Sequence, residues 1–172
     1  MSTNASKSPA AEAESYQVLT FVLGSETYGV DILRVQEIRG WSAVTKIPNS
    51  APHVLGVLNL RGSIVPVVDL RKRFSLEQAE YTAVTVIIVL SVRGQAGRRD
   101  FGVVVDGVSD VVDVQASEVR PTPDLGCRAA TDHIRGLVPV NERMVVLLDL
   151  DRLIGAEMVE VPTGEQAEPA AA

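Results

Sequence analysis

The side chains best suited to chemistry in this chain are two histidines and a single cysteine. His53 and His133 have no second metal-binding residue three or four positions away, whereas a zinc site needs three or four converging ligands. Cys127 stands beside Arg128, whose charge would favour a thiolate, but no histidine accompanies it in a catalytic motif. Neither a Gly-x-x-x-x-Gly-Lys phosphate loop nor a Gly-x-Ser-x-Gly nucleophile elbow occurs. The sequence therefore predicts a protein that is not an enzyme and that uses no metal or cofactor.

Three aspartates, Asp69, Asp149 and Asp151, invite comparison with a catalytic carboxylate pair. Asp69 and Asp149 each follow an apolar, β-branched run and stand thirteen residues after a glycine, Gly56 or Gly136. An aspartate in that position accepts hydrogen bonds from the free amides of the first helical turn. We therefore interpret Asp69 and Asp149 as helix caps rather than as an acid–base pair.

The elements that position these caps occur twice in the chain. Residues 56–74 predict a strand, a tight turn at Arg61 and Gly62, a second strand and a short helix, and residues 136–154 repeat this order. Pro66 cannot donate a hydrogen bond to a neighbouring strand, which predicts an edge strand or a bulge there. Many short strands with turns at near-regular spacing favour a mainly β fold of two small barrels.

Two local predictions concern the joins between strands. Asp31 is placed to cap a short helix over residues 32–38, where apolar residues three apart would share one face, and a continued strand is the alternative. The dipeptide Asp106-Gly107 predicts a hairpin turn between two strands.

Composition restricts the domain organisation. Residues 1–14 and 157–172 are small and polar or acidic, so we expect disordered tails. A polar linker near residues 75–80 divides the rest into a first β-barrel subdomain, 15–80, and a second, 81–156.

Charge and cysteine content restrict the location and the partners. A net charge of −6 with 4% aromatic residues opposes a nucleic-acid surface. A single cysteine cannot form an internal disulfide, which fits a reducing cytosol. The chain begins without the apolar run of a signal peptide, and no apolar stretch reaches the roughly 18 residues that span a bilayer. We expect a cytoplasmic protein without direct membrane insertion.

Polar residues inside apolar runs point to a binding surface. Asn59 and Arg61 interrupt a strand and its turn, and Glu37 lies within the apolar stripe of Val35 and Ile38. Solvated turn residues are one interpretation of this pattern. Pairing between Glu37 and Arg61 across a partner surface is the other.

Several motifs together resemble the CheW family, the bacterial chemotaxis coupling proteins. The resemblance covers about residues 16–154, with the motifs in the family's order; they are residues 28–32, 35–40, 56–57, 59–62, 64–71 and 102–111. It implies two five-stranded SH3-like β-barrels packed side by side with a few short helices, forming one domain over 15–156 in which a strand can cross between barrels. The basic loop 93–99 is longer than the family pattern leads us to expect.

The resemblance also implies a function and its partners. The function is an adaptor that joins the regulatory domain of the histidine kinase CheA to the cytoplasmic tips of methyl-accepting chemotaxis receptors. Such an adaptor is recruited to receptor arrays beneath the inner membrane. An adaptor of a related pilus-type or other chemosensory system is the alternative.

Partner-binding positions are implied by the same resemblance, with the two valines Val86 and Val108 expected near a groove between the barrels. The full set is Val35, Glu37, Ile38, Gly56, Asn59, Arg61, Gly62, Val86, Val105 and Val108. Two other functions stay open: an enzyme with a site between the barrels, which converging titratable groups in a deep pocket would support, and a nucleic-acid-binding barrel, which needs a basic face.

Overall fold

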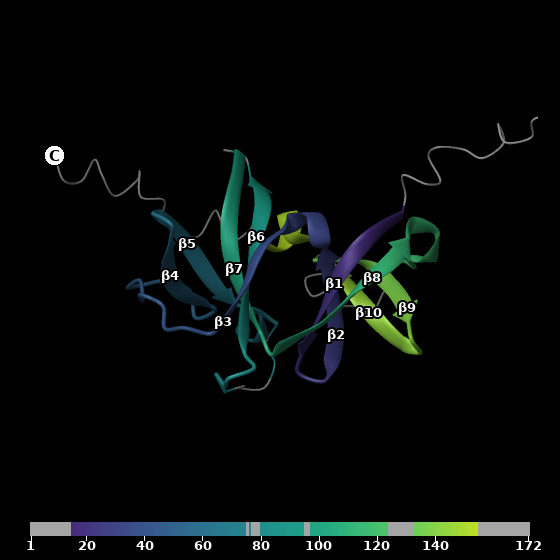
Figure 1. Cartoon of the computed structure of the whole chain (residues 1–172), viewed down its shortest axis with the longest axis horizontal. Helices are drawn as coiled ribbons and strands as arrows, with labels where there is room; N and C mark the ends of the chain where they lie inside the picture. Colours follow the sequence, from purple (N-terminus) through teal and green to yellow (C-terminus); the bar gives the residue numbers. More distant parts are fainter. Residues whose placement is uncertain (1–14, 75, 77–79, 95–96, 124–132, 155–172) are drawn as a thin grey trace, which may run out of the picture.

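The computed structural model describes residues 15–74, 76, 80–94, 97–123 and 133–154 (Figure 1). The predicted disordered tails and Cys127 lie outside these residues. The elements are β1 (Ser15–Leu23), β2 (Glu26–Asp31), η2 (Ile32–Arg34), β3 (Val35–Gly40), β4 (Val54–Leu60), β5 (Ser63–Asp69), α2 (Leu70–Arg73), β6 (Val86–Gly94), β7 (Gly97–Val105), β8 (Gly107–Gln115), η3 (Ala116–Glu118), β9 (Ile134–Val140) and β10 (Arg143–Leu148). Among the residues described, no helix is long and apolar enough to cross a membrane.

The strands form two five-stranded sheets, each curled into a small barrel. The first sheet has the order β8-β1-β2-β10-β9 and the second β3-β6-β7-β5-β4. In Figure 1 the second sheet lies on the left and the first on the right. The predicted mainly β fold of two five-stranded barrels is confirmed.

The sheets do not follow the predicted division between 15–80 and 81–156. β1 and β2 join β8, β9 and β10, and the predicted boundary falls inside the second sheet, between α2 and β6. The chain crosses between the sheets at η2 and again at Asp106, so the crossing that the resemblance implied is present. The predicted division at residue 80 was wrong because a polar linker has the same composition whether it joins two strands of one sheet or two separate sheets.

The repeated hairpins are confirmed. Leu60 pairs with Ser63 across a turn in which Arg61 and Gly62 have φ values of 52° and 87°. β9 and β10 are joined by an equivalent turn at residues 141–142, with φ values of 49° and 67°. Positive φ at both central residues matches the right-handed twist of the flanking strands.

The aspartate caps are also confirmed. The Asp69 carboxylate accepts a hydrogen bond of 3.0 Å from the backbone N–H of Arg71, at the start of α2. The Asp149 carboxylate accepts one of 3.2 Å from the N–H of Arg152, and residues 150–154 are helical.

The repeated glycine of each unit lies where its barrel closes. Gly56, with φ 148°, is adjacent to the bridge between Thr45 and Val57, and a Cβ at this position would collide with the carbonyl oxygen of Thr45. Gly136 lies beside the corresponding bridge between Arg120 and Leu137. Closure of each barrel therefore brings two backbones together at a residue without a side chain.

Residues 32–38 are not one helix. Asp31 caps as predicted, accepting a 2.9 Å hydrogen bond from the N–H of Leu33, but only η2 is helical and β3 follows at once. β3 pairs with β6, placing Val35 opposite Leu90. Pairing with a distant strand overrides the weak helical spacing of so short a segment, as the alternative interpretation allowed.

Two strand-end predictions need correction. Asp106-Gly107 is not a hairpin turn, because β7 and β8 belong to different sheets and the chain crosses between them there. β5 is not an edge strand, since it lies between β7 and β4. The parallel pairing of β5 with β7 begins only at Val67. Pro66 lies before that position, so its missing N–H removes no hydrogen bond to β7.

Three hydrophobic clusters make up the core, and the largest is shared by both sheets. The first sheet encloses Val18, Val114, Val138, Val145 and Leu147, and the second encloses Leu58, Val65, Val67, Ile87, Val89 and Val104. The shared cluster takes Phe21 and Val30 from the first sheet and Ile88, Phe101 and Val103 from the second. Alternate residues of β6 and β7 thus face different clusters, which explains why residues 87–89 are buried on both faces.

Candidate partner-binding surface

Glu37 and Arg61 form an ion pair on the second sheet. β3 carries Glu37, the β4–β5 turn carries Arg61, and Arg61 Nη2 lies 3.1 Å from Glu37 Oε1. The Glu37 side chain is 27% exposed and that of Arg61 84%. Of the two interpretations of these residues, the ion pair is present, and its arginine also extends into solvent, where such pairs contribute only about 0–1 kcal/mol to folding. The partner surface stays a prediction.

Asn59 and Gly62 shape the turn that presents Arg61. The Asn59 Oδ1 accepts a hydrogen bond of 3.0 Å from the Gly62 N–H, fixing the turn from within. An added Cβ at Gly62 would meet open space, so the positive φ and not crowding favours glycine there. Both residues are exposed beside Arg61.

The apolar residues of β3 divide between two sides. Ile38 is 43% exposed, but consecutive strand residues point to opposite faces, so its side chain lies on the other side of β3 from Glu37. Val35 is half-buried and packs against the shared cluster.

A second group of predicted positions lies near the crossing between the sheets. Val86 is half-buried against the shared cluster and pairs with Val105, and Val108 follows just beyond the crossing, 36% exposed. Val86 lies opposite Gly40, the last residue of β3, whereas Val35 is the first. At the rise of a strand per residue, the length of β3 separates Val35 from Val86 by about 17 Å. Val86 and Val108 therefore lie at the crossing between the sheets, away from Val35.

Gly56 and Val105 are not on the surface. Gly56 is buried at the closure of its barrel, and Val105 is fully buried in the shared cluster. The side chain of Val105 is therefore unavailable to a partner, and Gly56 has a backbone role.

The sequence interpretation missed a buried polar cluster between the sheets. Arg71 donates through Nε to Asp69 (3.0 Å) and through Nη1 to Asp106 (2.9 Å), and the Tyr81 hydroxyl donates to Asp69 (2.7 Å). Asp106 also accepts from the N–H of Gly24 in the β1–β2 turn (2.7 Å). The cluster fastens the second sheet to the first at the crossing.

Burial and bonding oppose each other in setting these pKa values. Burial alone would raise the pKa of Asp69, but hydrogen bonds from Arg71 and Tyr81 outweigh it and lower that pKa. Burial, followed by the bond to Asp69, raises the pKa of Tyr81 to about 12. The cluster is thus held as an ionised Asp69–Arg71 pair with a neutral tyrosine.

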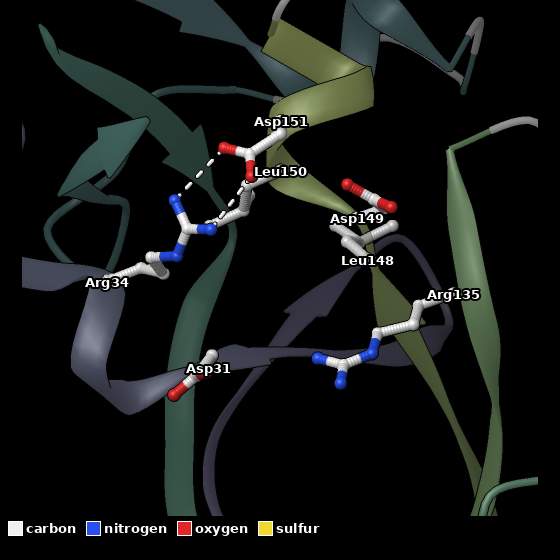
Figure 2. Close-up of a pocket in the computed structure, with 7 residues that line it drawn as sticks. All are labelled: Asp31, Arg34, Arg135, Leu148, Asp149, Leu150 and Asp151. Atoms are coloured by element: carbon white, nitrogen blue, oxygen red, sulfur yellow. Dashed lines mark hydrogen bonds and ion pairs between the residues drawn. The ribbon is translucent and has the colours of Figure 1, made fainter. Parts of the chain in front are cut away.

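A second tie between the sheets lines an open cavity of about 360 Å³ (Figure 2). Arg34 of η2 binds Asp151 through two nitrogen–oxygen contacts of 3.0 and 2.8 Å, and the N–H of Arg93 in β6 donates to the same carboxylate at 3.0 Å. Asp31, Arg135 and Asp149 also line the cavity.

The Asp151 carboxylate of this cavity is held by its bonds to the two arginines. Burial would raise the pKa of Asp151, but the bonds from Arg34 and the Arg93 N–H lower it, so the carboxyl stays ionised and engaged. In the described ranges no group of histidine, cysteine or carboxylate side chains is placed to hold a metal.

The comparisons with known proteins cover both sheets. A family model described as a CheW-like domain matches residues 17–158. The chemotaxis protein CheW of Klebsiella aerogenes is 45% identical over 148 residues, which is 86% of this chain and 87% of that protein. The chemotaxis protein CheW of Bacillus subtilis is 31% identical over 152 residues, 88% of this chain and 94% of that protein. The crystal structure of scaffolding protein TtCheW from Thermoanaerobacter tengcongensis matches with a TM-score of 0.73 and 29% identity, covering 81% of this chain and 87% of that chain.

Proposed function

The chain belongs to the CheW-like family, and from that premise we propose that it couples a CheA-type histidine kinase to the cytoplasmic tips of methyl-accepting chemotaxis receptors. As a family member it is a chemotaxis scaffold or coupling adaptor. We propose that it acts by binding, without catalysis of its own, in the cytoplasm at receptor arrays.

The observation that carries this proposal is the exposed Glu37–Arg61 pair. An ion pair with an arginine 84% exposed adds little to folding, so a contribution to binding is the better explanation of its placement. The turn fixed by Asn59 and Gly62 presents the guanidinium at a defined position, and arginine is frequent among residues that dominate binding energy. We assign Glu37 and Arg61 to the kinase-facing surface.

The receptor-facing surface is assigned to the seam between the barrels. Receptor tips in this family are long helices, which bind by laying an apolar stripe into a hydrophobic groove. Val86 and Val108 lie at the crossing between sheets with partly accessible side chains. Stiff, β-branched valines lose little rotamer freedom on binding, which suits this role.

The test is kinase activation in a reconstituted mixture of adaptor, CheA-type kinase and receptor-containing membranes. Arg61→Ala is expected to weaken kinase binding about tenfold, or about 1.4 kcal/mol, and to reduce activation with it, while the melting temperature falls by no more than about 4 °C. Asn141→Ala is the matched control, because Asn141 holds the same position, with φ 49°, in the equivalent turn of the first sheet.

The double variant Glu37→Arg with Arg61→Glu, which exchanges the two charges, tests whether the kinase requires the ion pair itself or contacts the Glu37 and Arg61 side chains directly. If the kinase contacts each side chain, the exchange restores the ion pair but not activation. Normal activation by Arg61→Ala, together with a large loss of stability, would show that Arg61 is structural and would refute the assignment.

A further inference from the structure

Strands β5 and β7 diverge at one end and leave an open groove between them. Their parallel pairing runs from Val67 opposite Gly102 to Asp69 opposite Val104. In the part of the chain that the structure describes, no ladder joins the preceding residues of the two strands. The space between them is a groove of about 270 Å³, called here the β5–β7 groove; it is lined by Ser63, Ile64, Val65, Pro66, Arg98, Arg99 and Asp100.

The register of each hairpin shows which backbone groups face this groove. Leu60 and Ser63 close the β4–β5 turn, so they exchange both hydrogen bonds, and the next pair of residues does not. The N–H and C=O of Ile64 therefore point away from β4, toward β7. The same alternation applies to the β6–β7 hairpin, in which the Gly94–Gly97 pair closes the turn. Arg98 and Asp100 belong to pairs that do not exchange hydrogen bonds, so their backbone N–H and C=O groups point away from β6, toward β5.

The groove combines two basic side chains with polar and apolar ones, and Ile64 is its exposed large apolar residue. Arg98 and Arg99 are exposed, and Arg93 lies directly opposite Arg98 on β6, so like charges concentrate at this hairpin. Asp100 offsets only one of them. The whole chain carries a net charge of −6, which makes this a local departure from its overall sign. Ile64 is 64% exposed.

We propose that the β5–β7 groove binds an extended, acidic segment of a partner protein by strand addition. The unpaired N–H and C=O groups of Ile64, Arg98 and Asp100 would bond to the backbone of the added strand. Arg98 and Arg99 are consecutive strand residues and point to opposite faces of the sheet. Glutamate or aspartate side chains on one face of the added strand would pair with Arg98, and apolar side chains on its other face would cover Ile64 beside Arg99. The backbone groups favour a peptide over a lipid surface, because a phosphate headgroup supplies no matching row of donors and acceptors.

The groove adjoins the proposed kinase-facing turn but is argued from different observations. Ser63 follows Gly62 directly, so a segment bound in the groove would reach the base of the turn that presents Arg61. The basic end of the β6–β7 hairpin would thereby have a function of its own. Strand addition in the β5–β7 groove does not require Arg61 to contact a kinase.

The test uses the full-length ¹⁵N-labelled protein and a synthetic eight-residue peptide that alternates glutamate with valine or threonine. Binding is expected to shift the backbone amides of Ile64, Arg98 and Asp100. The double variant Arg98→Glu with Arg99→Glu should weaken binding about tenfold or more, a value typical of losing close charge pairs. Arg143→Glu, an exposed charge reversal on β10 outside the groove, is the matched control and should leave binding unchanged.

Two further probes separate strand addition from charge alone. A peptide of the same charge with proline at alternate positions cannot form the ladder and is expected to lose binding. Equal binding of the proline peptide, or no binding of the alternating peptide, would overturn the proposal. So would phosphatidylglycerol vesicles that bind through Arg98 and Arg99 while the alternating peptide does not.

Discussion

Replacing Arg71 by methionine tests whether the buried polar cluster holds the two sheets together. The side chains of Arg71 and Asp69 are each 2% exposed, and the guanidinium also bonds to Asp106 at the crossing. Methionine keeps the apolar stem of the side chain and removes the charge. Asp69 would then be left as a buried carboxylate without its cation.

The magnitude follows from what remains around Asp69. Breaking a buried ion pair by removing one partner typically costs about 3–5 kcal/mol. Asp69 would keep the Tyr81 hydroxyl and the backbone N–H of residue 71, so we expect the lower end, about 3 kcal/mol. For a chain of this length that is a fall in melting temperature of about 6–12 °C.

The assay is urea unfolding followed by far-ultraviolet circular dichroism, with Arg34→Met as the matched control. Arg34 makes the same kind of pair with Asp151, but their side chains are 29% and 37% exposed, so the control should lose only about 0–1 kcal/mol. The pH dependence adds an independent check. Since Asp69 without Arg71 can shed its charge by binding a proton, the deficit of Arg71→Met should shrink as the pH falls.

Equal, small losses for Arg71→Met and Arg34→Met would refute this reasoning. That result would mean that water or a rearranged side chain replaces the cation at Asp69. A deficit that stays constant from pH 7 to about pH 4 would refute the charge-based explanation in particular.

Three other predictions follow from the same structure. Because its pKa is lowered in the folded state, Asp69 stabilises the protein above its ordinary pKa and loses that contribution as the pH falls below about 4; Asp69→Asn should flatten acid unfolding in this range. Gly56→Ala should destabilise the protein by about 2 kcal/mol or more in urea unfolding, well beyond Gly62→Ala, because only at Gly56 would the new methyl group collide with the carbonyl of Thr45. Val35→Asp should cost about 1–3 kcal/mol in urea unfolding, because it would place a carboxylate against the shared cluster on which Val35 is half-buried; an unchanged unfolding midpoint would contradict that packing role.

What the sequence could predict was mainly local. The caps at Asp69 and Asp149 and the turn at Arg61-Gly62 depend on neighbouring residues, and each was predicted correctly. The Glu37–Arg61 ion pair was one of two interpretations that the sequence left open, because an acid in an apolar stripe and an arginine in a turn can each be solvated or paired; the structure contains the pair.

The connections between the sheets could not be predicted in this way. Asp106 bonds to Arg71 and to Gly24, which are 35 and 82 residues away, and Asp-Gly is the same dipeptide in a hairpin and at a crossing. Asp69-Leu70-Arg71 predicted a helix start, but nothing local indicates that the arginine would turn inward. Gly56 did carry a usable signal, because a glycine recurs at the equivalent position 136. The structure gives the reason: at both positions the backbone of another segment approaches closely where the barrel closes.

The interleaved order of the strands has a consequence for how the protein is made. The second sheet is one uninterrupted stretch, from β3 to β7, whereas the first sheet takes strands from before and after it. During synthesis from the N-terminus, β1 and β2 leave the ribosome first yet lack β8, β9 and β10, so Phe21 and Val30 have no complete sheet of their own. The later-emerging second sheet can assemble as soon as β7 is out, and its face of Ile88, Phe101 and Val103 then offers those early side chains a place to pack. The two strands that are translated first are thus completed into a sheet last, on a surface that the middle of the chain provides.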